Sequence, residues 1–436
     1  MTQTRETREN NRRRGGAVRR MVAAAVLFVS SAALMILSAR VPAFAEWHAE
    51  HIYPLLTGSI GRISGVFPFS VSEIGIYALL CVFVVTWIRL VIRTVRICRK
   101  SPGSSGPAGA VEEKPSMLIV RWIAGVLLTA GILAFLYTVC CGINYHRRSF
   151  SEEEGIVTES YSVEDLKEVC ILLTEQVNVL ADDVGRDENG ILVLEESEQK
   201  GGVEALYSLA ETYTSMEGYY PRPKELIFSE ILSYQQLTGI YLPFTVEANY
   251  NGDMTSYNKP FTVCHELSHL RGFMQEQEAN FIAFLACIGS EREDFRYSGY
   301  LSCWVYCTNA LYRADPESWQ EVRSLIDAAA EPDLAANNAF WDRYEGPVSD
   351  TAERINDTYL KVNGQADGVK SYDRMVDLVV RIIRREDKKD KIKDRIQTIS
   401  WSLNAVFFEQ DIRELSYRRR RIIFEILPLL LLLLFL

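Results

Sequence analysis

The centre of the chain carries the stretch Pro260-Phe261-Thr262-Val263-Cys264-His265-Glu266-Leu267-Ser268-His269-Leu270-Arg271-Gly272. A proline in the first turn and a glycine after the last residue are the usual boundary signals of an α-helix. Val263, Leu267 and Leu270 recur at helical spacing, which predicts a stripe buried in a core. His265 and His269 are four positions apart and therefore share a different face of the same helix.

This predicted helix also carries a metal-binding pattern. Two neutral imidazoles one helical turn apart can bind one Zn²⁺, and a glutamate beside them can accept a proton from a metal-bound water. The alternative is that the two histidines lie on a surface helix and bind no metal. The chain has only five histidines in 436 residues, so a chance match to the motif is rare. We therefore expect Zn²⁺ at His265 and His269, with Glu266 as the general base.

A zinc site of this kind needs a third protein ligand. No histidine follows His269, and Gln275 stands where the third histidine of an HExxHxxGxxH motif would be, so the ligand must be a carboxylate. Glu276 and Glu278, at the start of the next predicted helix, are the two candidates. Glu278 is preferred, because it can point across the helical hairpin while its neighbours pack below.

Three long apolar runs occupy the first third of the chain, at residues 21–39, 74–92 and 117–143. Each is close to the length of about 20 residues that crosses the hydrocarbon of a bilayer. A cleaved signal peptide is the rival interpretation of the first run, since residues 41–45 look like a cleavage site. The run is longer than the apolar core of about 7–15 residues in a signal peptide, so an uncleaved anchor is favoured.

Basic residues set the expected orientation of these segments in the membrane. They gather at the N-terminus and between the second and third runs, as is typical of cytoplasmic segments. Three crossings then place everything after residue 145 outside the cytoplasm. The net charge of −10 argues against nucleic acid as a partner, because phosphate binding needs a clustered basic face.

The rest of the chain predicts a mainly α (α+β) domain, helix-rich with a small sheet. A capping-box pattern at Ser162 begins one helix, and helical spacing indicates further helices near residues 202–216, 223–237, 296–313, 317–330, 348–362 and 372–385. Residues 239–247 are rich in β-branched and aromatic types and include Pro243, which suits an edge strand. Such a strand could hold an extended peptide, although a purely structural hairpin is equally compatible with the pattern.

The zinc-helix stretch, followed by Glu276-Gln277-Glu278-Ala279-Asn280-Phe281, resembles a family of uncharacterised bacterial membrane proteins that combine membrane spans with a zinc-peptidase-like (gluzincin-like) core. The resemblance covers about residues 20–385. Glu278-Ala279-Asn280 is more distantly similar to the segment that supplies the glutamate ligand in the phage-repressor-cleaving and stress-response metallopeptidases, which implies Glu278 as the third ligand. Gluzincins of the thermolysin type also carry an acid four residues after that glutamate, where this chain has Ile282.

These observations together predict the organisation of the chain. We expect a basic cytoplasmic tail at 1–20, three transmembrane helices at 21–145 with a cytoplasmic linker near 93–116, a zincin-like domain at 146–385, and a charged helical extension at 386–436. The apolar end of that extension fits a fourth crossing, an interfacial helix or a reading-frame accident near the end of the gene.

The expected function is that of a membrane-anchored zinc metallopeptidase, with the bilayer and a peptide or protein substrate as partners. One alternative is a non-catalytic zinc-binding membrane sensor or scaffold. Against it stands Glu266, because a purely structural site does not require a base. A zinc amidase acting on cell-wall material is the other alternative.

Overall fold

The computed structural model describes residues 2–99 and 114–387. Contacts divide the chain into two units, residues 1–382 and 383–436, and the account below concerns the first. Apart from its first two residues, the charged extension predicted at 386–436 lies outside the described residues. The same holds for its apolar end.

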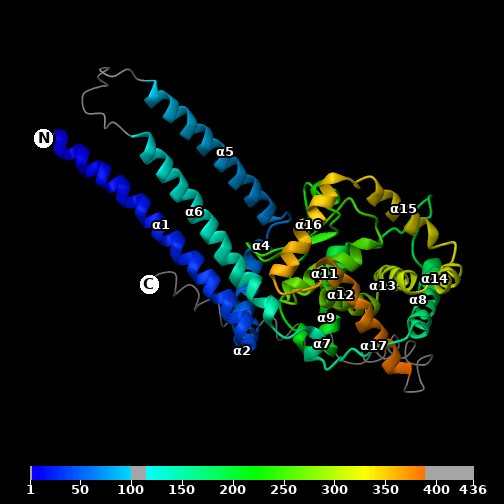
Figure 1. The fold of residues 1–436 in the computed structure, drawn as a ribbon. Coiled ribbons are helices and arrows are strands. Elements are labelled where there is room, and N and C mark those ends of the chain that lie inside the picture. The colour runs from blue at the N-terminus through cyan, green and yellow to red at the C-terminus, as the bar shows by residue number, and fades with distance from the viewer. Residues whose placement is uncertain (1, 100–113, 388–436) are drawn as a thin grey trace, which may run out of the picture. The chain divides into compact units, whose positions relative to one another are not determined.

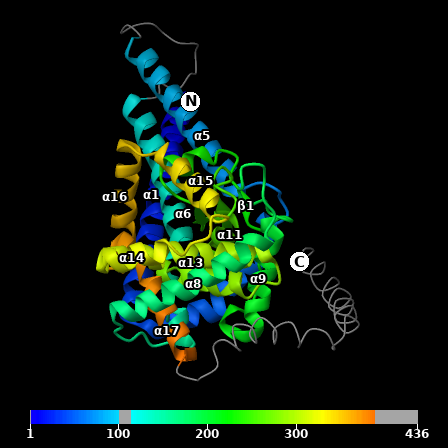
Figure 2. The same ribbon diagram turned by 90° about the vertical axis from the view of Figure 1, so that its right-hand side faces the viewer.

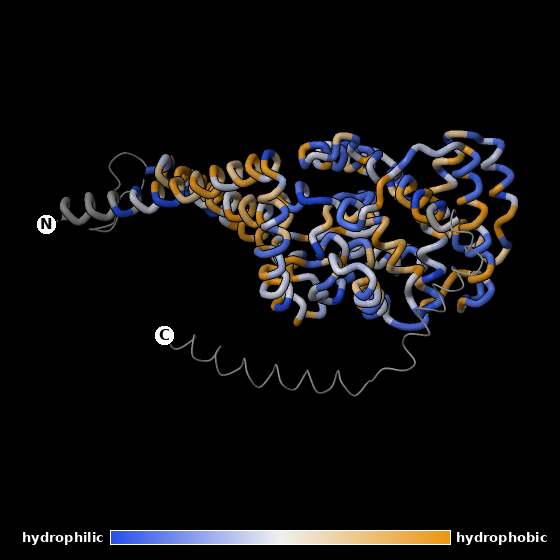
Figure 3. Tube along the Cα trace, turned by 90° about the horizontal axis from the view of Figure 1, so that it is seen from below, coloured by the Kyte–Doolittle hydropathy of each residue, from blue (hydrophilic) through white to orange (hydrophobic). Residues whose placement is uncertain are grey.

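Three long helices precede the domain: α1 (Thr2–Arg40), α5 (Val71–Cys98) and α6 (Pro115–Cys140). Each contains a stretch that is long and apolar enough to cross a membrane, as the sequence predicts. Helix α1 and helix α5 both pack against α6. Figure 1 shows the three helices side by side, and Figure 3 shows how strongly apolar residues dominate them.

The connection between α1 and α5 is also helical. It consists of α2 (Pro42–Trp47), α3 (Tyr53–Leu56) and α4 (Arg62–Ser64), joined by short helical turns. Tyr53 is fully buried and donates a hydrogen bond to the carbonyl oxygen of Leu270, at 3.1 Å. This connection therefore packs against the end of the helix that carries the zinc-binding pattern.

The domain itself is mainly α-helical, as predicted. Ser162 and Asp165 form the expected capping box at the start of α8. The helix predicted at residues 223–237 is wrong in its first half, which forms a strand, and only a short helix follows. The helices of the domain are α7 (Phe150–Glu153), α8 (Val163–Asp183), α9 (Glu198–Thr212), α10 (Glu230–Tyr234), α11 (Asn258–Leu270), α12 (Glu276–Ile288), α13 (Glu293–Ala314), α14 (Pro316–Arg323), α15 (Glu331–Asp342), α16 (Pro347–Val362) and α17 (Met375–Asp387).

A small three-stranded sheet accompanies these helices. Its strands are β1 (Lys224–Glu225), β2 (Gly239–Leu242) and β3 (Glu247–Tyr250), in the order β1-β3-β2. Strand β3 pairs parallel with β1 and antiparallel with β2. The strand predicted at 239–247 is thus two strands of a hairpin, because the chain turns from Pro243 onward, where a proline cannot donate to the ladder. Strand β2 lies at the edge, as the proline suggested.

Helix α11 lies at the centre of the domain. It packs against α9, α12, α13 and the two strands β2 and β3. Every residue from Pro260 to Leu270 is buried, including the polar ones. A helix buried on all sides carries polar side chains only where they have partners, so its histidines and glutamate require a specific explanation.

Helix α5 is tied to the sheet by reciprocal hydrogen bonds. The backbone N–H groups of Val71 and Ser72 donate to the carboxylate of Glu247, at 3.1 and 2.8 Å. In return, Glu73 of α5 accepts from the backbone N–H groups of Ile227 and Phe228, at 2.9 and 3.0 Å. The long helices and the domain therefore share one network of buried contacts.

Candidate metal centre

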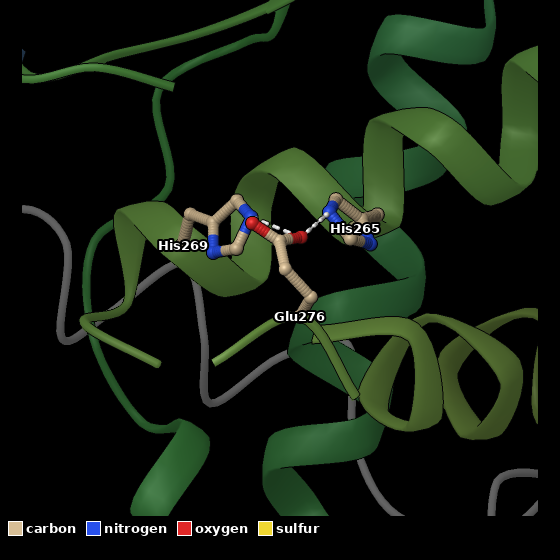
Figure 4. A group of neighbouring side chains, drawn as sticks. All are labelled: His265, His269 and Glu276. Carbon is tan, nitrogen blue, oxygen red and sulfur yellow. Dashed lines mark ion pairs between the residues drawn. The ribbon is translucent and has the colours of Figure 1, made fainter. Parts of the chain in front are cut away.

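His265 and His269 of α11 meet the first residue of α12, Glu276. The Oε2 atom of Glu276 lies 3.2 Å from Nε2 of His265 and 3.5 Å from Nε2 of His269. Figure 4 shows the two rings facing the carboxylate from one side of α11. One ligand atom from each of the three residues lies within 4.8 Å of the others. These three side chains could therefore hold one small cation.

A tight turn brings the two helices together. Gly272 ends α11 with φ +100°, a conformation that residues with a Cβ rarely adopt. The N–H of Phe273 donates to the carbonyl of Ser268, at 3.2 Å, which closes the helix end in the manner of a Schellman motif. Only a few residues then separate the end of α11 from Glu276, so the carboxylate returns to the face that carries the histidines.

Hydrogen bonds on the far side of each ring fix the tautomers. Nδ1 of His265 lies 2.7 Å from Oδ1 of Asn280, and Nδ1 of His269 lies 2.8 Å from the carbonyl oxygen of Phe273. Both partners are acceptors, so each Nδ1 carries the proton and each neutral ring presents the lone pair of Nε2 to Glu276. Three acceptor atoms therefore converge on one point. Their lone pairs repel one another unless a cation or an extra proton lies between them.

The separations fit a tetrahedral zinc ion. Ligand bonds of about 2.0–2.2 Å place neighbouring tetrahedral ligand atoms about 3.3–3.5 Å apart, close to the two separations involving Glu276. The Oε2 atoms of Glu276 and Glu266 are buried, and no described group donates a hydrogen bond to either. The donor set of two imidazoles and one carboxylate is also that of catalytic zinc sites.

In the absence of a metal, a proton serves as the cation. Burial lowers the pKa of His265. For His269 burial acts in the same direction, but the Glu276 carboxylate outweighs it and raises the pKa to about 9. Burial likewise disfavours the charged form of Glu276, yet the two histidines lower its pKa to about 2. The metal-free centre thus holds an ionised Glu276 beside a protonated His269.

Glu266 lies beside this cluster and faces the edge strand. A Cβ at position 239 would overlap Oε1 of Glu266, so only glycine fits there. Burial raises the pKa of Glu266 to about 8, and the nearby His269 offsets this only in part. A carboxyl group with a pKa near neutrality is suited to accept and return a proton.

The structure does not bring Glu278 to the histidines. Its carboxylate accepts hydrogen bonds from the N–H and the hydroxyl of Ser151, at 2.9 and 2.8 Å. Two residues on a helix differ by about 200° in direction, so Glu276 and Glu278 point to opposite sides of α12. The preference for Glu278, and the role implied for it by resemblance, are therefore corrected in favour of Glu276.

This correction also identifies a supporting residue that was missed. Four residues after Glu278 stands Ile282, which cannot orient a ring, whereas four residues after Glu276 stands Asn280, which bonds His265. A supporting residue four positions after the ligand glutamate was therefore visible in the sequence, but the prediction placed it relative to Glu278 and not Glu276. No signal in the sequence pointed to Gly239 or to the carbonyl of Phe273.

Taken together, the fold and this cluster define a helix-rich, membrane-associated chain with a buried His-His-Glu centre. The chain belongs to the family described as Protein of unknown function (DUF3810), whose model matches residues 48–380. The match includes α5, α6 and nearly the whole domain. Neither a curated protein nor a solved structure matches the chain.

Proposed function

We propose that the protein is a membrane-anchored zinc metallopeptidase in which His265, His269 and Glu276 hold Zn²⁺ and Glu266 is the general base. One observation carries the proposal. Two imidazole nitrogens with fixed lone pairs and one ionised carboxylate oxygen converge inside the protein, and none of the four residues is more than 8% exposed. Such a set of acceptors is stabilised by a cation and by little else.

The residues divide the chemistry between them. A bound Zn²⁺ would polarise a carbonyl group and lower the pKa of a coordinated water. Glu266 takes the proton of the attacking water and returns it to the nitrogen of the leaving amine, so the base ends the cycle as it began. Its buried position keeps bulk water from competing for that proton.

The edge strand supports a peptide as the substrate. Gly239 begins β2 and lies against Glu266, and β2 is at the edge of its sheet. An extended peptide that paired with this edge would pass close to the base. A compact, non-peptide amide would gain nothing from the strand.

The proposed location is a bacterial plasma membrane, with three crossings and the domain outside the cytoplasm. The domain adjoins the C-terminal ends of α1 and α6 and the N-terminal end of α5 (Figure 1). Arg89, Arg93, Arg96 and Arg99 lie toward the opposite end of α5. A positive excess at that end is typical of the cytoplasmic side.

The test is the metal content of the full-length protein in detergent, purified with a histidine-free tag. We expect near-stoichiometric zinc in the wild type and in Glu278→Gln, and loss of most of it in Glu276→Gln. The two variants make the same chemical change two residues apart, so Glu278→Gln is the matched control. Equal zinc in both variants, or none in the wild type, would overturn the proposal.

A further inference from the structure

Large apolar side chains are exposed in three segments of the domain and its connection. We call these segments the rim: residues 66–69, residues 227–231 and the helix α16. Val66 is 79% exposed, Phe228 57%, Ile355 66% and Val362 76%. Exposed apolar groups that gather in this way mark a surface that meets another apolar phase.

Two rim segments are attached to α5. Residues 66–69 lead directly into its first turn at Val71. The ring of Phe228 packs edge-on against Tyr77 of α5, with centroids 5.6 Å apart. The backbone bonds from Ile227 and Phe228 to Glu73 hold this segment in place. Both segments therefore lie beside the first turns of α5 and extend its exposed apolar surface.

The third rim segment, α16, faces α1 and α6. Val348, Ile355 and Val362 are seven residues apart and form one exposed stripe of the helix. Beside the stripe, the Tyr359 ring packs against Tyr137 of α6, with centroids 6.2 Å apart. These contacts leave α16 close to the long helices without closing the space between them.

That space is a groove of about 620 Å³. One wall is the stripe of α16, including Ile355 and Val362, and the other contains Met35 of α1 and Tyr137 of α6. Exposed Arg354 also lines it and supplies a positive charge. An open apolar groove with a cation suits a hydrocarbon chain attached to an anionic head.

The positions along the helices place the rim near a bilayer surface. Helix α5 has 28 residues and is about 42 Å long, whereas the hydrocarbon of a bilayer is about 30 Å thick. Tyr77 lies six residues into α5, and Tyr137 lies three residues before the end of α6. Both contacts thus fall within about 10 Å of a helix end, at the depth where hydrocarbon meets head groups.

We infer that the rim is a membrane-contact surface and that the groove binds an acyl chain of a phospholipid. Lipid is the occupant that fits, because the rim adjoins α5 at one place and α1 and α6 at another, and so continues the surface that the long helices present to the bilayer. A second copy of the chain would instead need one self-complementary patch. The inference does not depend on the metal centre.

The test uses the full-length wild-type protein in vesicles whose phospholipids carry a photoreactive diazirine on the acyl chain. We expect labelled peptides from α16 and residues 227–231, as well as from the long helices. Helix α8 provides the internal control: Val179 is 63% exposed, but Figures 1 and 2 show α8 on the side of the domain away from α1, α5 and α6. Labelling of the rim no stronger than that of α8 would overturn the inference.

A second measurement distinguishes lipid from another protein chain. The photoreactive residue benzoyl-phenylalanine replaces Ile355 in one variant and Val179 in the other, and both positions are exposed enough to accept it. Phospholipid adducts several times more abundant at 355 than at 179 are expected in the mass spectrum of the intact protein. A covalent dimer formed through position 355 in place of lipid adducts would overturn the inference.

Discussion

Two clusters of buried charged side chains in this protein differ in how their polar atoms are satisfied. At the sheet, Glu247 pairs with Lys224 and also accepts hydrogen bonds from two backbone N–H groups of α5. The ammonium of Lys224 donates as well to the carbonyl of Ser64, at 2.6 Å. Charge is balanced here within the protein, so this cluster acts as a structural joint between α5 and the domain.

At the candidate metal centre the charge balance depends on an added proton or cation. Glu276, His265 and His269 turn acceptor atoms toward one another, and no described group donates to Oε2 of Glu276 or of Glu266. The comparison teaches that burial of charge does not by itself indicate function. The distinguishing feature is whether the protein supplies every partner or leaves a place for a cation.

The largest expected effect concerns Glu266, to which the proposed function gives a chemical and not a structural role. Glu266→Gln should retain zinc and lower peptide hydrolysis about 10²- to 10⁴-fold, because the base is lost while the ligands remain. The measurement is the rate of cleavage of a mixed peptide library, with metal content determined on the same sample. Unchanged cleavage would remove Glu266 from the mechanism, and lost zinc would assign it a structural role.

A change at the joint between α5 and the sheet should lower stability and leave zinc binding unchanged. Lys224→Met leaves Glu247 buried without its cation, so we expect the free energy of unfolding to fall by about 3–5 kcal/mol. Thermal unfolding in detergent measures the loss, and the zinc content of the folded fraction should not change. A variant as stable as the wild type would mean that backbone hydrogen bonds alone satisfy Glu247.

Asn280 sharpens the description of the metal centre. Asn280→Ala removes the acceptor that orients His265, and we expect zinc affinity to fall about 10- to 100-fold without loss of the fold. Competition with a chromogenic chelator gives the affinity. The matched control is Asn249→Ala in β3, a buried asparagine whose amide donates to the carbonyl oxygens of Ile240 and Glu247 and not to a histidine. An equal loss of affinity in both variants would contradict an orienting role.

Taken per pH unit, the smallest expected effect is a dependence of zinc binding on pH. The pKa of His269 in the metal-free protein is raised to about 9, so zinc must displace a proton at neutral pH. Apparent affinity should therefore increase by up to about tenfold per pH unit and level off above about pH 9. In the metal-free protein the raised pKa stabilises the fold fully below about pH 6.5, and this contribution is lost as pH rises through about 9. A flat affinity profile between pH 6 and 9 would contradict the protonated state.

Prediction from sequence succeeded where the determining interactions are local. The three long apolar helices follow from apolar length alone. The start of α8 follows from Ser162 and Asp165, which bond within one turn. It failed at residues 223–237, where helical spacing was outweighed by pairing of β1 with the distant strand β3. The prediction likewise gave one strand where the structure has the hairpin of β2 and β3. The turn at Pro243 depends on which neighbour each strand pairs with.

For the metal centre, the sequence by itself determined His265, Glu266 and His269. Their grouping is fixed by positions along one helix, whose geometry does not depend on the rest of the chain. Only the tertiary structure shows that Glu276, and not Glu278, lies against the histidines, because the turn at Gly272 sets which side of α12 returns to α11. The space that Gly239 leaves for Glu266 and the docking of the long helices onto the sheet are also tertiary, since they join residues far apart in sequence through packing that no local pattern encodes.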